Sequence, residues 1–385
     1  MLPTLSKTAL LRSFSATTAL LAALVAVPAL AQTQDIVVGQ VAPLSGVLAD
    51  TGREMVLGGQ IYFDSINAKG GIKGRRIRHV VKDDAYQVEK TVALTRELLD
   101  KDNAVALFGY AGTGNIGQLL QDGVLARANV ALIAPYTGSE TLRNPFNPYI
   151  FHLRAGYADE ARVMVDYFLS NGMKRIAVMY QDDAFGKAGL AGIEAALKLK
   201  GLKAVALGSY PKNTDDVAPA VKTIAAADPQ AIALISVNKS SAAFIRQYRA
   251  SGKAPLMFNI SVVNAQELAR ISGAETARGV AITQVVPYPF SDVIPVVKEY
   301  QALLKQYGPK DAKPSYTSFE EFLGAKVLVE GLKRSKTISR EGLMSALSGL
   351  NFDTGGFQVA FEPNKRVGSS FVDITVIGRD GKLMR

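Results

Sequence analysis

IVVGQVA, residues 36–42, is an almost uninterrupted apolar run, and residues 52–68 after it place Val56, Phe63 and Ile66 on one helical face. Apolar strands that lack polar alternation and are followed by amphipathic helices are typical of parallel sheets covered on both faces. This stretch therefore predicts an α/β fold, and the rest of the chain extends the same pattern in both its halves.

The strand–helix alternation occurs in two consecutive sets. In the first set we predict strands at 36–42, 76–82, 104–108 and 130–134, with helices at 52–68, 88–99 and 115–127. In the second set we predict strands at 175–180, 204–207, 231–236 and 256–259, with helices near 157–171, 185–199, 214–226 and 239–250. Helices near 291–307 and 315–334 and strands at 357–361 and 371–377 follow, and we expect them to complete the two earlier units. The chain is thus predicted to form two doubly wound, Rossmann-like lobes that face each other across a cleft.

Composition excludes several classes of site. The 385 residues include no cysteine, so disulfides, thiolate nucleophiles and cysteine-held metal centres are absent. Only two histidines occur, His79 and His152, which argues against a multi-histidine metal site, and we predict no metal and no cofactor. The net charge of +10 does not indicate nucleic acid, because most basic residues stand singly among acids and the densest cluster, residues 73–78, lies in a turn.

The first 31 residues are predicted to be a secretory signal peptide outside the fold. Lys7 and Arg12 precede the apolar run 19–27, and Ala29-Leu-Ala31 follows as a cleavage signal before Gln32. The apolar run is shorter than the roughly 20 residues that span a bilayer. The mature chain is therefore expected to begin at Gln32 and to lie in the periplasm.

Two neighbouring loops in the first set carry groups that suit a small polar ligand. Gly112-Thr-Gly-Asn-Ile-Gly117 matches the G-x-G-x-x-G pattern, but it follows the third strand and no acid ends the next one, which argues against a dinucleotide. Free N–H groups of Thr113 and Gly114 at a helix start could instead hold a carboxylate. Residues 134–140, rich in hydroxyls, follow the fourth strand at the same sheet edge, either as part of this site or as a simple turn.

In the second set, Gln181-Asp-Asp-Ala-Phe-Gly186 ends a strand and opens a helix. Asp183 suits the helix N-cap. Phe185 could cover a ligand or pack in the core. Catalytic arrangements are missing: there is no G-x-S-x-G elbow, and neither histidine stands in an evident serine–acid pattern. We therefore predict that the protein is not an enzyme.

Several motifs in sequence order together resemble the periplasmic leucine/isoleucine/valine-binding proteins, the solute receptors of ABC importers with the type I binding-protein fold. The segments that carry the resemblance are 36–46 (IVVGQVAPLSG), 67–74 (NAKGGIKG), 83–85 (DDA), 246–252 (RQYRASG) and 316–326 (YTSFEEFLGAK). They extend over essentially the whole mature chain. The resemblance implies two lobes joined by a three-crossing hinge, with lobe 1 at 32–152 plus 286–365 and lobe 2 at 153–285 plus 366–385.

The resemblance also implies which residues bind the ligand. Thr113 falls where the family has a carboxylate-binding serine, with Gly114 beside it. The loop after the fourth strand supplies Tyr136, Thr137 and Gly138, and Phe185 matches an aromatic residue of the second lobe. The family's second-lobe tyrosine falls near Val237-Asn238, where Asn238 is the candidate, and its ammonium-binding glutamate falls near Ile260-Ser261, where Ser261 is the candidate. Neither Ser261 nor the residue before it is an acid.

A buried ammonium group requires an anionic partner. The expected ligand is therefore a small carboxylate, either an amino acid bound through another acid such as Glu320, or an aromatic or aliphatic acid without an ammonium group. The predicted function is a monomeric periplasmic receptor that closes on this ligand and docks on an ABC permease. One alternative is an exported sensory protein that binds the same ligand. Another is an enzyme on the same fold, against which the missing catalytic residues argue.

Overall fold

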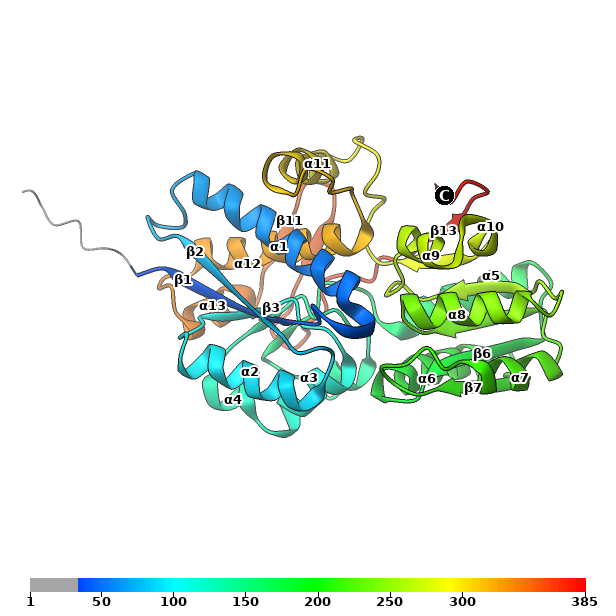
Figure 1. The fold of residues 1–385 in the computed structure, drawn as a ribbon. Helices are drawn as coiled ribbons and strands as arrows, with labels where there is room; N and C mark the ends of the chain where they lie inside the picture. The colour runs from blue at the N-terminus through cyan, green and yellow to red at the C-terminus, as the bar shows by residue number, and fades with distance from the viewer. Residues whose placement is uncertain (1–33) are drawn as a thin grey trace, which may run out of the picture. The chain divides into compact units, whose positions relative to one another are not determined.

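The structure is a computed structural model that describes residues 34–385 (Figure 1). The predicted signal peptide, residues 1–31, lies outside the described residues. Within the described part of the chain, no helix combines the length and apolar character needed to cross a membrane.

The first sheet is parallel and has five strands in the order β2-β1-β3-β4-β5. Its strands are β1 (Ile36–Ala42), β2 (Ile77–Asp83), β3 (Ala106–Phe108), β4 (Leu132–Ile133) and β5 (Ile150–Phe151). Helices around it are α1 (Ala49–Ala68), α2 (Val88–Asp100), α3 (Thr113–Gln121), α4 (Val124–Ala128), α11 (Pro295–Tyr307), α12 (Tyr316–Arg334) and α13 (Arg340–Leu347). These elements and the hairpin β11 (Asn351–Asp353)–β12 (Gln358–Ala360) form the first lobe. All seven residues of β1 are buried, as its apolar composition predicts.

The helices α1 and α12 pack against each other at unusually short range. A Cβ atom on Gly58 would lie 2.1 Å from the Ser318 carbonyl oxygen, and one on Gly59 would lie 2.5 Å from the Phe108 ring. Only glycine permits this approach, because any side chain there would overlap the neighbouring backbone or ring. The late helix α12 is therefore an integral part of the first lobe.

The second sheet has seven strands in the order β14-β13-β10-β9-β8-β6-β7. Its strands are β6 (Ile176–Gln181), β7 (Ala206–Tyr210), β8 (Ala231–Ile235), β9 (Leu256–Asn259), β10 (Ala281–Gln284), β13 (Asp373–Ile377) and β14 (Leu383–Met384). Its helices are α5 (Tyr157–Ser170), α6 (Ala184–Leu199), α7 (Ala218–Ala226), α8 (Asn238–Arg249), α9 (Ala265–Ser272) and α10 (Ala274–Ala277). Strands β6 to β10 pair in parallel, whereas β13 pairs antiparallel with β10 and with β14. These elements form the second lobe.

The chain passes between the two lobes three times. It leaves the first sheet after β5, returns after β10, and crosses again after β12 to reach β13 (Figure 1). The first and third crossings pair with each other, since His152 N donates to Arg366 O at 2.8 Å and Gly368 N donates to His152 O at 2.8 Å. The predicted two-lobe α/β architecture is confirmed, while the residue boundaries proposed for the lobes stay a prediction.

Two details differ from the sequence-based expectation. The predicted helix 115–127 is interrupted, because Gly123 adopts a left-handed conformation between α3 and α4 with φ of 60°. Several elements were not predicted, since they are short and their apolar periodicity is brief: strands β5, β10, β11 and β14 and helices α9, α10 and α13.

Candidate functional site

A small cavity, in part open to solvent, lies between the lobes at the carboxyl ends of the strands. The first lobe lines it mainly with Leu48, Tyr86, Ala111, Gly112, Thr113 and Tyr136. The second lobe contributes Tyr157, Phe185, Val237 and Val262. Three tyrosines, one phenylalanine and several aliphatic side chains make the walls largely apolar, with few polar groups to orient a ligand.

The start of α3 supplies the polar end of the cavity. Gly112 precedes the helix with φ of 97°, and a Cβ atom there would lie 2.6 Å from the Tyr86 ring, so the position requires glycine. Thr113 is the first helical residue, and N–H groups in the first turn of a helix have no intrahelical acceptor. This end of the cavity therefore offers backbone donors, the Thr113 hydroxyl and the positive end of the helix dipole.

The predicted loop after β4 supports this end in two ways. Thr137 is fully buried, and its Oγ1 lies 2.7 Å from Thr113 Oγ1 and accepts a hydrogen bond from Ser139 N at 3.3 Å. Gly138 lies against Tyr157, whose N donates to Gly138 O at 2.7 Å. Thr137 and Gly138 thus lie behind the lining residues, while Tyr136 from the same loop forms part of the cavity wall.

On the second-lobe side, one of the three predicted residues lines the cavity and the other two do not. Phe185 lines the cavity and packs edge-to-face on Tyr157 with ring centroids 5.8 Å apart. Asn238 Oδ1 accepts from Asn264 N, and Ser261 bonds to Glu160, so neither of them lines the cavity. Their neighbours in sequence, Val237 and Val262, line it instead.

Tyr86, which the sequence analysis did not select, is a fully buried part of the wall, and so is Tyr157. Tyr86 follows Ala85 in a left-handed turn, with φ of 62° and 50° respectively, and this turn directs the chain after β2 toward the cleft. Gln181 Nε2 of the second lobe donates to the Tyr86 hydroxyl at 3.4 Å. Burial raises the pKa of Tyr86 well above its ordinary value, so the phenol stays neutral.

Lys212 reaches from the second lobe to the same wall. Its Nζ lies 4.0 Å from the Tyr86 ring centroid and donates to Asn115 Oδ1 at 3.0 Å. Asn115 belongs to the first turn of α3, so Lys212 brings a cation close to the helix start. Together with the Gln181 contact, this shows the lobes touching on the β2 side of the cavity.

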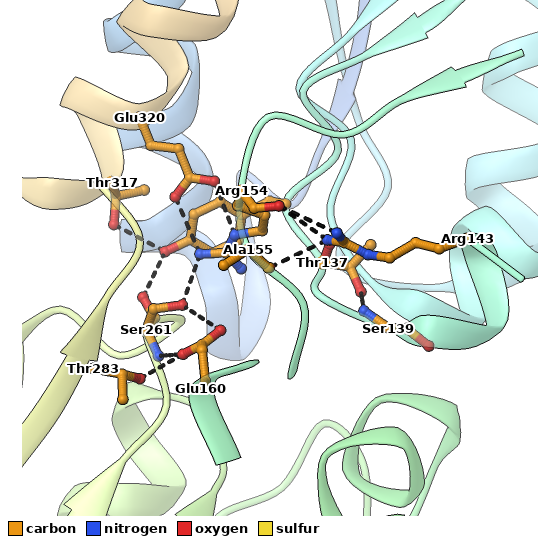
Figure 2. A network of polar contacts seen from close by, with 11 residues as sticks. Thr137, Ser139, Arg143, Arg154, Ala155, Glu160, Ser261, Thr283, Thr317 and Glu320 are labelled. Atoms are coloured by element: carbon orange, nitrogen blue, oxygen red, sulfur yellow. Dashed lines mark hydrogen bonds and ion pairs between the residues drawn. The ribbon is translucent and has the colours of Figure 1, made fainter. Parts of the chain in front are cut away.

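The acids near the cavity are already bonded within the protein. Arg154 Nε lies 2.9 Å from Glu320 Oε1, and Arg154 Nη2 donates to Glu320 Oε2 at 3.1 Å (Figure 2). Glu160 accepts from Ser261 N at 2.8 Å, from Ser261 Oγ at 3.0 Å and from Thr283 Oγ1 (Figure 2). Burial raises the pKa of Glu320, and the Arg154 guanidinium opposes this shift by favouring the ionised carboxylate. Among the described residues, no acidic side chain lines the cavity.

The family model described as "Periplasmic binding protein" matches residues 35–382, and the chain belongs to this family. A substrate-binding periplasmic protein from Ralstonia solanacearum is 38% identical, with a TM-score of 0.87 over 91% of this chain and 99% of that one. The Leu/Ile/Val-binding protein homolog 7 of Brucella abortus (strain 2308) is 27% identical over 86% of each chain. A branched-chain amino acid ABC transporter protein from Thermus thermophilus with bound valine, 19% identical, covers 92% of this chain and 95% of its own and shares the fold with a TM-score of 0.82.

These comparisons confirm the predicted type I periplasmic binding-protein fold and the relationship to leucine/isoleucine/valine-binding proteins. The family and its structural neighbours are solute-binding proteins, not enzymes. Accordingly, the interlobe cavity is a candidate binding site.

Proposed function

We propose that this protein is the periplasmic receptor of a branched-chain-amino-acid-type ABC importer and that it binds a small monocarboxylate without an ammonium group. The observation that carries the proposal is the asymmetry of the cavity. The first-lobe side has the Thr113 hydroxyl and the start of α3, whereas the second-lobe side has Tyr157, Phe185, Val237 and Val262. A carboxylate suits the donors of the first side, and an apolar body suits the mainly apolar second side.

The absence of an acid among the lining residues argues against a free amino acid as the ligand. An α-ammonium group held next to Val262 would be buried without a counter-charge, which is costly. Glu320, the acid that a rearranged amino-acid site would use, is paired with Arg154 through two nitrogen–oxygen contacts. The aromatic and aliphatic walls instead favour an aromatic or branched aliphatic acid.

The proposed mechanism is closure of the lobes on the ligand. The first and third crossings pair at His152 and Val367, so the chain can bend beside this short bridge while both sheets stay rigid. A ligand that contacts Thr113 on one side and Phe185 on the other binds the closed form more tightly than the open form. It therefore shifts the equilibrium toward the form that would dock on a permease.

Export supports the same proposal. The segment 1–31 carries the features of a cleaved signal peptide, and the family to which the chain belongs is periplasmic. The receptor is proposed to act as a monomer with a membrane permease as its partner. Ligand-dependent uptake in cells with and without the gene would distinguish transport from a purely sensory role.

A thermal-shift screen tests the ligand class. Residues 32–385 are unfolded and refolded to remove carried-over ligand, and then mixed with leucine, isoleucine, valine, phenylalanine, their deaminated acids and benzoate. A ligand at 100 times its Kd adds about 2.7 kcal/mol to the free energy of unfolding. We expect shifts with the deaminated acids or benzoate, whereas shifts with the amino acids alone would refute the proposed ligand class.

Replacing Thr113 by valine is expected to weaken carboxylate binding by about 1.5–3 kcal/mol, because the variant keeps the side-chain volume but loses a hydrogen bond to a charged group. Titration calorimetry with the acid that gives the largest thermal shift measures the change. Thr113→Ser, which retains the hydroxyl, is the matched control and should bind nearly as tightly as the native protein. Equal Kd values for the valine and serine variants would remove Thr113 from the site.

A further inference from the structure

Arg154 lies on the first crossing between the lobes, between β5 and α5, and its side chain is fully buried. Arg154 is not one of the residues that line the cavity, and it lies at the centre of the polar network in Figure 2. Residues of both lobes surround it, and the network extends from α12 to the strand β10 through Ser261, Glu160 and Thr283.

On the first-lobe side, Arg154 holds two groups. Its guanidinium pairs with Glu320 of α12, and it stacks on the Tyr136 ring with its central carbon 4.4 Å from the ring centroid. The Tyr136 hydroxyl lies 3.2 Å from Thr317 Oγ1 of the same helix. Arg154 and α12 thereby fix the orientation of a side chain that forms the cavity wall.

On the second-lobe side, the same guanidinium donates from Nη2 to Ser261 Oγ at 3.0 Å. Ser261 O in turn accepts from the Tyr136 hydroxyl at 3.4 Å. Ser261 directly precedes Val262, the second-lobe residue that lines the cavity. The bonds between Arg154, Tyr136 and Ser261 therefore connect the first-lobe wall of the cavity to its second-lobe wall.

The incomplete hydrogen bonding of the Arg154 guanidinium also argues against a purely structural role. Arg154 Nη1 is buried and has no hydrogen-bond partner among the described residues. A buried ion pair is weak evidence for stability, because desolvation offsets much of the attraction and an apolar pair is often equally stable. Arg154 bonds to Glu320 of the first lobe and to Ser261 of the second, so its side chain joins the lobes.

We propose that Arg154 is a positioning residue that stabilises the closed, ligand-bound form by tying the Tyr136 wall to the Ser261–Val262 loop. It touches no ligand atom, and it acts through Tyr136 and Ser261. The inference rests on the proposed function only for the choice of ligand, since closure itself can be followed without one. The expected consequence is that loss of Arg154 weakens ligand binding without a matching loss of stability.

The test variant is Arg154→Met combined with Glu320→Leu, which removes both charges together and leaves neither one buried alone. Closure is measured as the distance between labels at Lys90→Cys in α2 and Glu194→Cys in α6, both exposed, in a chain that has no other cysteine. Melting temperature and Kd are measured in parallel, with 3-phenylpropanoate, 4-methylpentanoate and benzoate as probes. Arg340→Met is the matched control, because Arg340 donates to Leu99 O, Ala104 O and Ala128 O within the first lobe alone.

We expect the double variant to melt within a few degrees of the native protein, to bind the probes about tenfold more weakly, and to show longer label distances with and without probe. The Arg340→Met control should melt lower and keep the native Kd and distances. Native Kd and native distances in the double variant would overturn the proposal. If that variant does not fold, Ser261→Ala decides, because it removes the second-lobe acceptor of Arg154 while Glu160 keeps its bonds from Ser261 N and Thr283 Oγ1. Unchanged Kd and distances there would equally overturn the proposal.

The label distances without probe separate this inference from the proposed function. If no acid of the panel binds the native protein, the ligand class is wrong. The Arg154 proposal is then judged by the unliganded distances alone, where the double variant should be more open than the native protein.

Discussion

Replacing Val262 by glutamate is expected to lower the affinity for a monocarboxylate at least a hundredfold. Val262 is buried in the second-lobe wall of the same small cavity as Thr113, where the ligand carboxylate is proposed to lie. Two like charges about 5 Å apart in a medium of effective dielectric constant near 20 repel by about 3 kcal/mol. The substitution thus adds an acidic side chain to the cavity wall. The lack of such a side chain among the lining residues is the basis of the proposed preference for ligands without an ammonium group.

Val262→Gln is the matched control, because it adds nearly the same volume and polarity without the charge. The difference in Kd between the two variants, measured by calorimetry at pH 7.5, isolates the effect of the charge. Lowering the pH should restore part of the affinity of the glutamate variant, since protonation of the new carboxyl removes the repulsion. A glutamate variant that binds monocarboxylates as tightly as the glutamine variant would contradict the proposed ligand position.

Replacing Glu321 by glutamine is expected to stabilise the protein at pH 7, by about 1.4 kcal/mol for each pH unit over which the folded protein holds a proton on Glu321 that the unfolded chain has released. Glu321 is fully buried on α12, and neither of its carboxyl oxygens has a hydrogen-bond partner among the described residues. Burial, assisted by the neighbouring Glu320, raises the pKa of Glu321 well above its ordinary value. The folded protein therefore holds a proton that the unfolded chain, with a glutamate pKa of about 4.3, releases at neutral pH.

The sign of the pH dependence follows from this proton. Because the folded state binds more protons above pH 4.3, the stability of the native protein should fall with rising pH, by up to about 1.4 kcal/mol per pH unit, until the folded pKa is passed. Urea unfolding between pH 5 and pH 8 should show this contribution in the native protein and not in Glu321→Gln. The exposed Glu341, changed to glutamine, is the control and should leave the curve unchanged. Parallel curves for the native protein and Glu321→Gln would show that Glu321 is ionised in the fold.

The sequence located most of the fold because its strands are apolar and its helices amphipathic, two patterns that depend on local order alone. It also led to three cavity residues that follow strand ends: Thr113 and Tyr136 after neighbouring strands of the first sheet, and Phe185 after a strand of the second. Val237 and Val262 were missed in favour of Asn238 and Ser261. A shift of one residue in a loop decides which side chain faces the cleft, and such a shift is not fixed by sequence spacing.

Arg154 could not be found from the sequence for a different reason. It stands in Leu153-Arg-Ala155, a crossing segment with no motif, and its partners Glu320 and Ser261 are more than 100 residues away. Only the tertiary fold brings these groups together. The same holds for Glu321, which lies next to Glu320 on the largely buried helix α12. That its carboxyl oxygens have no hydrogen-bond partner among the described residues is evident only when the packing around α12 is known.

The placement of α12 also dictates the order in which the chain can fold. The first sheet is complete at residue 151, yet its core includes Phe319 and Phe322, which follow the parallel strands β6 to β10 of the second lobe in the chain. During synthesis the first sheet must therefore wait, with one face exposed, until the segment up to Arg334 has emerged. An apolar face exposed for this long favours aggregation, so a nascent chain of this topology gains from being kept unfolded until its full length is available.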